Sequence, residues 1–125
     1  MMGIFEIYQD FRFESAHHLA SNVPIGHPYS RIHGHSFRVR VCLHGTSDAT
    51  TGWVIDLGIL ELALADLRSQ IDHNLLNDVP GLECPTLENI SKWVWEHLHP
   101  QFPSLFRVEV HRDSCGHGCV YMPRS

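Results

Sequence analysis

Three histidines have the residue type and spacing of a metal site. Two of them flank a glycine in His33-Gly34-His35, and His17 precedes them in the chain. Because side chains alternate along a strand, His33 and His35 point to the same side if their segment is extended. Three imidazoles without a fourth protein ligand are typical of catalytic zinc, whose open position takes water or substrate. The pattern predicts a Zn²⁺ site formed by His17, His33 and His35.

The segments that carry these histidines alternate in the way half-buried strands do. Apolar side chains recur at every second position through residues 4–17, which end at His17, and again through residues 33–43. If the two strands pair antiparallel, the end of the first lies beside the start of the second. The three imidazoles then converge at one end of one face, while His18 and His44 have the wrong parity. The alternative is that each is an ordinary, partly buried histidine satisfied by its neighbours.

The rest of the chain supplies the elements that would position this face. Asp56 and Thr86 can each N-cap a helix, the first with apolar positions from Leu60 to Ile71 and the second ending before Pro100. Residues 105–111 and 120–122 read as two short strands. The order predicts an α+β fold: a four-stranded antiparallel sheet with two helices on one face, ββααββ. Open sheet edges need cover, so we expect oligomerisation through the sheet.

Composition narrows the classes of protein that fit. A chain of 125 residues that is 43% hydrophobic suits a single domain spanning residues 1–125. The formal charge is −5 and no run of Lys or Arg is present, which argues against nucleic acid as a partner. No apolar segment is long enough to cross a membrane, and no export signal is evident, so we expect a cytoplasmic protein.

Two further groups of residues could do chemistry. Asp72 and His73 follow the first predicted helix, and a histidine beside a carboxylate is a candidate general acid or base. The alternative is a helix-end histidine that interacts with the helix dipole. Four residues near the C-terminus could form a second metal site: His111, Cys115, His117 and Cys119. The alternative is an ordinary turn with buried thiols. Trp53 is expected in the core or at a subunit contact.

Several motifs in fixed order resemble one enzyme family over nearly the whole chain. They are Phe13-Glu14-Ser15-Ala16-His17, His33-Gly34-His35-Ser36-Phe37, Gly52-Trp53-Val54-Ile55-Asp56, Asp72-His73-Asn74-Leu75-Leu76-Asn77 and Pro85-Thr86-Leu87-Glu88. Together they resemble the 6-pyruvoyltetrahydropterin synthase family, and most closely its bacterial branch of 6-carboxy-5,6,7,8-tetrahydropterin synthases, which act in queuosine biosynthesis.

The resemblance implies a tunnelling fold, in which the sheets of several chains join into a barrel and two trimers stack as a homohexamer. It implies a zinc-dependent lyase that converts 7,8-dihydroneopterin triphosphate to 6-carboxytetrahydropterin, with loss of acetaldehyde and triphosphate. By position, His17, His33 and His35 match the family's zinc ligands, and Asp72 and His73 match two members of its catalytic triad.

Two positions depart from the family pattern. The third triad member is a cysteine four residues before the first histidine of His-Gly-His, and here that position is Tyr29. Tyrosine has a pKa near 10 against about 8.5 for cysteine, so its catalytic role is open. Asp113 replaces the family's pterin-binding glutamate and can still accept two hydrogen bonds. The open alternatives are a synthase that uses Tyr29, a 6-pyruvoyltetrahydropterin synthase-like or dihydroneopterin side-chain lyase, and a pterin- and metal-binding protein without turnover.

Overall fold

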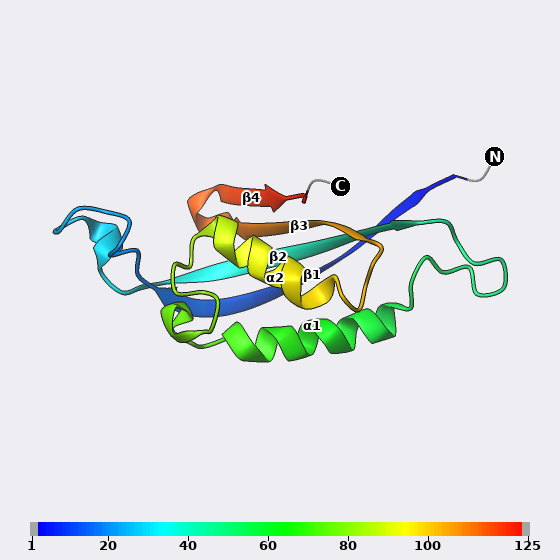
Figure 1. Cartoon of the computed structure of the whole chain (residues 1–125), viewed down its shortest axis with the longest axis horizontal. Coiled ribbons are helices and arrows are strands. Elements are labelled where there is room, and N and C mark those ends of the chain that lie inside the picture. The colour runs from blue at the N-terminus through cyan, green and yellow to red at the C-terminus, as the bar shows by residue number, and fades with distance from the viewer. Residues whose placement is uncertain (1–2, 124–125) are drawn as a thin grey trace.

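Four strands and two helices make up the part of the protein that the structure describes. The structure is a computed structural model, which describes residues 3–123 (Figure 1). In chain order the elements are β1 (Phe5–His17), β2 (His33–Gly45), α1 (Leu57–Ile71), α2 (Leu87–Leu98), β3 (Leu105–Arg112) and β4 (His117–Tyr121). Three short 3₁₀ turns, η1 (Pro28–Ser30), η2 (Leu76–Asp78) and η3 (Asp113–Cys115), lie in the connections.

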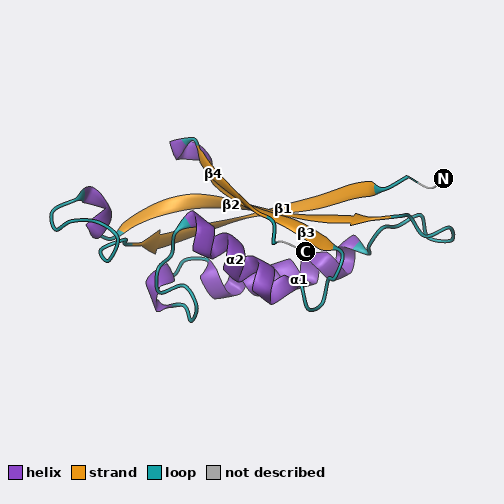
Figure 2. Ribbon diagram, turned by 45° about the horizontal axis from the view of Figure 1, so that its top comes forward, coloured by secondary structure: helices purple, strands orange, loops and turns teal. Residues whose placement is uncertain are grey.

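The strands form one antiparallel sheet in the order β1-β2-β3-β4, and both helices cover the same face of it (Figure 2). Phe13 pairs with Phe37 across β1 and β2, and their rings stack with centroids 4.7 Å apart. Both rings are fully buried beneath the helices, together with apolar residues of α1, α2 and β3. The predicted ββααββ fold is therefore confirmed, whereas the barrel concerns contacts between chains and stays a prediction.

The helices begin where the sequence indicates. The Asp56 carboxylate accepts a hydrogen bond from the Gly58 backbone N–H at 2.8 Å, and the Thr86 hydroxyl accepts one from the Asn89 N–H at 3.2 Å. Each cap satisfies a backbone donor that the first helical turn leaves unpaired. Both predicted caps are thus confirmed.

The last strand differs from its predicted bounds. Residues 120–122 were expected to form it, but β4 runs from His117 to Tyr121 and includes Gly118. Gly118 pairs with His111 of β3, and a Cβ at this glycine would clash with the His111 ring. Glycine, which usually weakens a strand, therefore extends this one because it makes room for a neighbouring ring.

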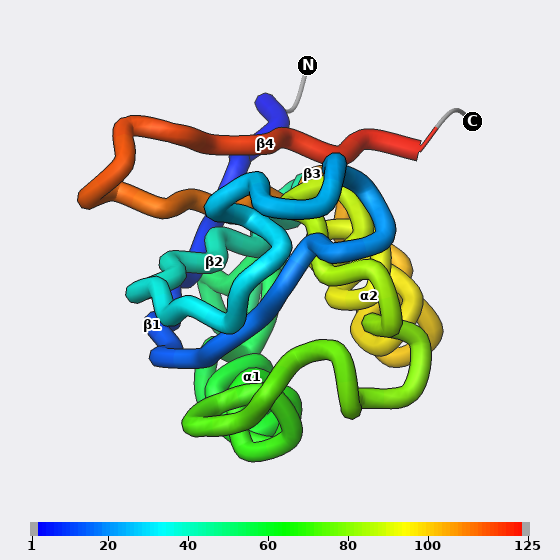
Figure 3. Tube along the Cα trace, turned by 90° about the vertical axis from the view of Figure 1, so that its left-hand side faces the viewer, coloured from blue at the N-terminus to red at the C-terminus, as the bar shows by residue number. Residues whose placement is uncertain are grey.

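Three of the connections lie at one end of the sheet. The segment between β1 and β2, the segment between α1 and α2, and the β3–β4 turn all lie at the left of Figure 1, and Figure 3 looks at the molecule from that end. This is also the end at which His17 pairs with His33. Within residues 3–123, no helix is both long enough and apolar enough to cross a membrane.

Candidate metal and acid–base site

The three predicted histidines meet at the end of β1 and β2. One ring nitrogen from each of His17, His33 and His35 lies within 4.8 Å of the other two. The strand register causes this, because His17 pairs directly with His33 and the alternation of β2 returns His35 to the same face. Among residues 3–123, this is the one group of three or more potential metal ligands that is close enough to share an ion.

Backbone carbonyls orient two of the imidazoles. His17 Nδ1 lies 2.9 Å from the Pro85 carbonyl oxygen, and His33 Nδ1 lies 2.8 Å from that of Arg31. A carbonyl only accepts hydrogen bonds, so each Nδ1 carries the proton and each Nε2 is left with a lone pair. Such backbone partners fix the tautomer and orientation of metal-binding histidines.

The donor set fits a divalent metal. The two Nε2 atoms of His17 and His33 lie 3.0 Å apart, although neither has a proton to donate when both rings are neutral. Facing lone pairs repel unless a cation lies between them. Tetrahedral zinc with Zn–N bonds of about 2.05 Å would separate two ligand nitrogens by about 3.3 Å, close to the spacing present. The residues therefore fit a zinc-like ion.

The pKa values of the cluster favour neutral imidazole, the form that binds metals. Burial lowers the pKa of His17, and the nearby His33 adds to this effect against the opposing hydrogen bond to Pro85. Burial and the positive charge of Arg112 lower the pKa of His35 to about 4. Both shifts disfavour protons, which compete with a metal for the ring nitrogens.

Asp72 and His73 form a second polar group beside the edge of β1. His73 Nδ1 lies 2.9 Å from Asp72 Oδ2, and the other Asp72 oxygen accepts a hydrogen bond from the Glu14 N–H. The hydrogen bond from the Glu14 N–H is the main cause that lowers the pKa of the Asp72 carboxyl, and the hydrogen bond with His73 lowers it further. His73 has a positive φ of 55° and donates its own N–H to the Glu14 carbonyl. This clamp leaves His73 Nε2 directed away from Asp72, as a general acid or base requires.

A cleft joins the two groups. It has a volume of about 610 Å³, and its lining includes His35 on β2, His73, Glu14 on β1 and Ser114 of η3. The Ser36 hydroxyl donates a hydrogen bond of 2.6 Å to the Glu14 carboxylate within this lining. A substrate in the cleft could therefore contact His35 and His73 together, whereas Asp72 is not in the lining.

Tyr29 lies next to the histidine cluster but outside this lining. Its ring centroid is 5.9 Å from that of His33, and the side chain is 43% exposed. The backbone of η1 holds it in place, since the Tyr29 carbonyl accepts a hydrogen bond from the Leu19 N–H. The structure thus brings the Tyr29 ring close to His33, and its catalytic role stays a prediction.

Asp113 faces the opposite side of the sheet from the cluster. Both of its carboxylate oxygens accept hydrogen bonds from Arg38, at 2.9 and 3.1 Å, and Arg12 lies 3.6 Å away. The hydrogen bond from Arg38 is the main cause that lowers the pKa of the Asp113 carboxyl. The predicted pterin-binding carboxylate therefore has an arginine as its partner within the chain.

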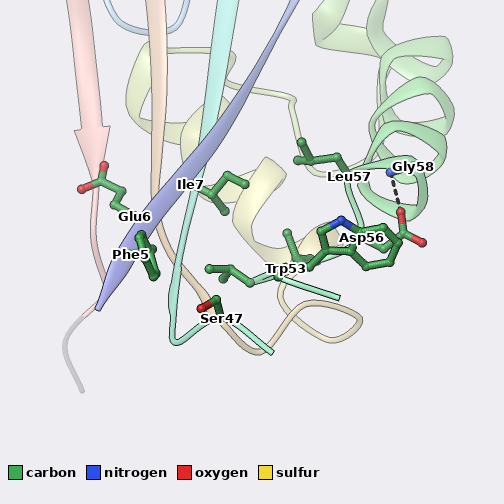
Figure 4. A pocket seen from close by; sticks show the side chains of 11 residues that line it. Phe5, Glu6, Ile7, Ser47, Trp53, Asp56, Leu57 and Gly58 are labelled. Carbon is green, nitrogen blue, oxygen red and sulfur yellow. Dashed lines mark hydrogen bonds between the residues drawn. The ribbon is translucent and has the colours of Figure 1, made fainter. Parts of the chain in front are cut away.

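The opposite end of the sheet contains a second cavity of a different kind. It has a volume of about 460 Å³, and Figure 4 shows Phe5, Ile7, Trp53 and Leu57 around it. Its lining also contains Asp56, but that carboxylate caps α1 (dashed line in Figure 4). Trp53 is 52% exposed, so within this chain it is at the surface, not in the core.

Sequence reasoning missed one contributor to the site. Arg112, the last residue of β3, places its Nη1 3.4 Å from His35 Nε2 and its Nη2 3.1 Å from His117 Nδ1. The parity of β3 could have indicated that Arg112 follows Val108 and Val110 on the buried face. Within residues 3–123, the candidate ligands of a second metal site do not lie close enough together to share an ion: His111, Cys115, His117 and Cys119. Cys115 Sγ lies 3.9 Å from His35 Nδ1.

Comparison with known proteins identifies the relatives of this chain. The family model described as "6-pyruvoyl tetrahydropterin synthase" matches residues 6–124. The chain is 37% identical, over 94% of its length and 94% of the relative, to 6-carboxy-5,6,7,8-tetrahydropterin synthase of Synechocystis sp.. It is 29% identical to dihydroneopterin monophosphate aldolase of Pyrococcus furiosus, over 60% of this chain and 62% of that one.

A solved structure shares the fold over nearly its whole length. The 6-pyruvoyl tetrahydropterin synthase of Caenorhabditis elegans superposes with a TM-score of 0.87, covers 98% of each chain and is 25% identical in sequence. The sheet, the two helices and their order are therefore common to both proteins.

Proposed function

Because the chain belongs to the 6-pyruvoyl tetrahydropterin synthase family, we propose that it is a zinc-dependent 6-carboxy-5,6,7,8-tetrahydropterin synthase. It would convert 7,8-dihydroneopterin triphosphate to 6-carboxytetrahydropterin and release acetaldehyde and triphosphate. The observation that carries the proposal is the convergence of His17, His33 and His35 in a chain 37% identical to a protein of that name.

The proposed roles follow from the geometry. His17, His33 and His35 hold the metal, which when bound acts as a Lewis acid that acidifies hydroxyls of the pterin side chain. His73 Nε2 takes up and returns protons at the side-chain carbons, because Asp72 holds its Nδ1–H. The cleft that contains both His35 and His73 keeps these groups within reach of one substrate.

Tyr29 is the proposed third acid–base group. It occupies the position of the family's cysteine, and its ring lies beside His33. The substitution Tyr29→Phe removes the hydroxyl and keeps the ring. We expect turnover to fall about 100-fold, and unchanged turnover would show that the Tyr29 hydroxyl has no part in the mechanism.

Pterin binding and assembly complete the proposal. Within one chain Asp113 faces away from the histidine cluster, so it would bind the amino-pyrimidine edge of a pterin held at the boundary between chains, replacing hydrogen bonds that it now accepts from Arg38. The sheet ends at β1 and β4, and pairing of these edges between chains would form the barrel and its homohexamer. Sedimentation analysis tests this: a mass of six chains is expected, and a monomer at all concentrations would contradict it.

The test of function is a product analysis. Zinc-loaded protein is incubated with 7,8-dihydroneopterin triphosphate, and the pterin product is identified by mass spectrometry. His35→Ala is the inactive control, and His18→Ala is the matched one, because His18 neighbours the cluster without belonging to it. Formation of 6-carboxytetrahydropterin by the parent and His18→Ala proteins supports the proposal. Unreacted substrate would leave a protein that binds pterin and metal without turnover.

A second candidate is cleavage of the dihydroneopterin side chain as an aldolase reaction. Two observations favour it: the tyrosine at the cysteine position and the similarity to a dihydroneopterin monophosphate aldolase. The same incubation separates the two reactions, because the aldolase product is a 6-hydroxymethyl-pterin and the synthase product carries a carboxylate.

A further inference from the structure

Among the arginines that belong to the four strands, Arg112 is the one that has no anionic partner within residues 3–123. Carboxylates lie within 4.0 Å of five arginines in the described residues: Arg12, Arg38, Arg40, Arg68 and Arg107. Within residues 3–123, no carboxylate lies within that distance of Arg112, and its buried Nε has no hydrogen-bond partner. Its immediate neighbours are the rings of His35 and His117.

The position of this charge is unfavourable unless an anion joins it. A partly buried guanidinium without a counterion bears a desolvation penalty that a histidine ring does not offset. Asp113 follows Arg112 directly, but its carboxylate is on the opposite face with Arg38. A divalent ion at the histidine cluster would add further positive charge beside the guanidinium, and the need for an anion would increase.

We propose that Arg112 is an oxyanion-binding residue, which holds a phosphate or carboxylate group of the ligand beside the histidine cluster. The observation that carries the proposal is this unpaired guanidinium 3.4 Å from His35 Nε2. The planar guanidinium suits both groups, because its parallel N–H donors match two oxygens of either. The class of ligand rests on the proposed function, whose substrate carries a triphosphate and whose product carries a carboxylate.

The test measures binding without turnover, so that it does not depend on the proposed reaction. Zinc-loaded protein is titrated calorimetrically with inorganic tripolyphosphate, with pterin-6-carboxylate and with pterin, which lacks the carboxylate. The variants are Arg112→Gln, which removes the charge, and Arg112→Lys, which keeps the charge and most of the aliphatic stem. Arg107→Gln is the matched control, since Arg107 is on the same strand but pairs with Glu6 and Glu109.

We expect Arg112→Gln to lower the affinity for one of the two oxyanion probes, tripolyphosphate or pterin-6-carboxylate, by about 10- to 100-fold, the range for hydrogen bonds to a charged group. The affinity of Arg112→Lys for that probe should lie between the affinities of Arg112→Gln and the parent. Arg107→Gln should bind the probe as the parent does, and the affinity for pterin should be the same in all variants. Tripolyphosphate as the affected probe assigns Arg112 to the substrate's phosphate, and pterin-6-carboxylate assigns it to the product. The proposal is overturned if both affinities survive in Arg112→Gln, or if the parent binds neither probe.

The proposed reaction can fail while this inference holds. A parent protein that binds tripolyphosphate through Arg112 but forms no pterin product would contradict the synthase reaction and retain the oxyanion site. Equal turnover of the substrate by the parent protein and by Arg112→Gln would support the synthase reaction and contradict the role of Arg112. Zinc content is measured for every variant, because a loss of metal would explain weaker binding without any contact to Arg112.

Discussion

The two ends of the sheet differ in the chemistry that they can support. At the end where β1 meets β2 through His17 and His33, polar side chains surround a cleft, and burial shifts the pKa values of two histidines. At the other end, about 40 Å away by the rise of a strand, Phe5 and Trp53 line a mainly apolar cavity whose carboxylate Asp56 serves as a helix cap.

The difference shows that the shape of a hollow does not identify a reactive site. Both cavities could accept a small molecule by size, but His35 is the one residue of these two linings whose pKa is shifted. The apolar end, with its exposed Trp53, has the character of a contact surface. Four changes test this division.

The largest effect is expected from removal of a cluster imidazole. His35→Ala should reduce bound zinc from one ion per chain to almost none and lower turnover by about 1000-fold or more, because the metal's contribution to the transition state is lost. Metal analysis after dialysis and a product assay measure this. Full zinc content in the variant would place the ion elsewhere in the molecule.

A smaller loss is expected from Asp72→Asn. The amide oxygen can still accept the hydrogen bond from the Glu14 N–H, but the negative charge beside His73 is lost. We expect turnover to fall by about 100-fold while zinc content stays at one ion per chain. Equal activity of the variant and the parent would exclude His73 as a proton carrier that depends on Asp72.

The histidine end should also make the metal-free protein sensitive to acid. The pKa of His35 is about 4 in the folded state against 6.5 as a reference, so the unfolded chain binds more protons between these values. The contribution of neutral His35 to the free energy of unfolding is therefore fully present above pH 6.5 and decreases as the pH falls toward 4. Thermal unfolding of metal-free protein should show a melting temperature about 5 °C lower at pH 4.5 than at pH 7.

The matched variant His35→Gln has no group that titrates at this position. Its melting temperature should decline less over the same pH interval, with His17 responsible for part of the remaining change because burial lowers its pKa as well. Identical slopes for the two proteins would show that other groups cause the sensitivity.

The smallest effect is expected at the apolar end. Trp53→Ala should leave zinc content unchanged and alter the free energy of unfolding by less than about 1 kcal/mol in the single chain, because half of the side chain is already exposed. If Trp53 contacts a neighbouring chain, sedimentation will show a smaller assembly. A loss of zinc in this variant would contradict the separation of the two ends.

The sequence by itself determined the parts that depend on local pattern. Alternation placed His17, His33 and His35 on one face, and the polar caps Asp56 and Thr86 marked the beginnings of both helices. These features follow from the period of side chains along an element and from hydrogen bonds to nearby backbone, which neighbouring residues are sufficient to specify.

Only the tertiary structure decided the features that join distant segments. Asp72 and His73 reach the edge of β1 through hydrogen bonds with Glu14, which lies 58 residues from Asp72 along the chain. Arg112 remains without a carboxylate while Asp113 pairs with Arg38, because Arg112 ends β3 on one side of the sheet and Asp113, which begins η3, turns to the other. Such pairings depend on strand register and on which side chains are already engaged, and local propensity contains neither.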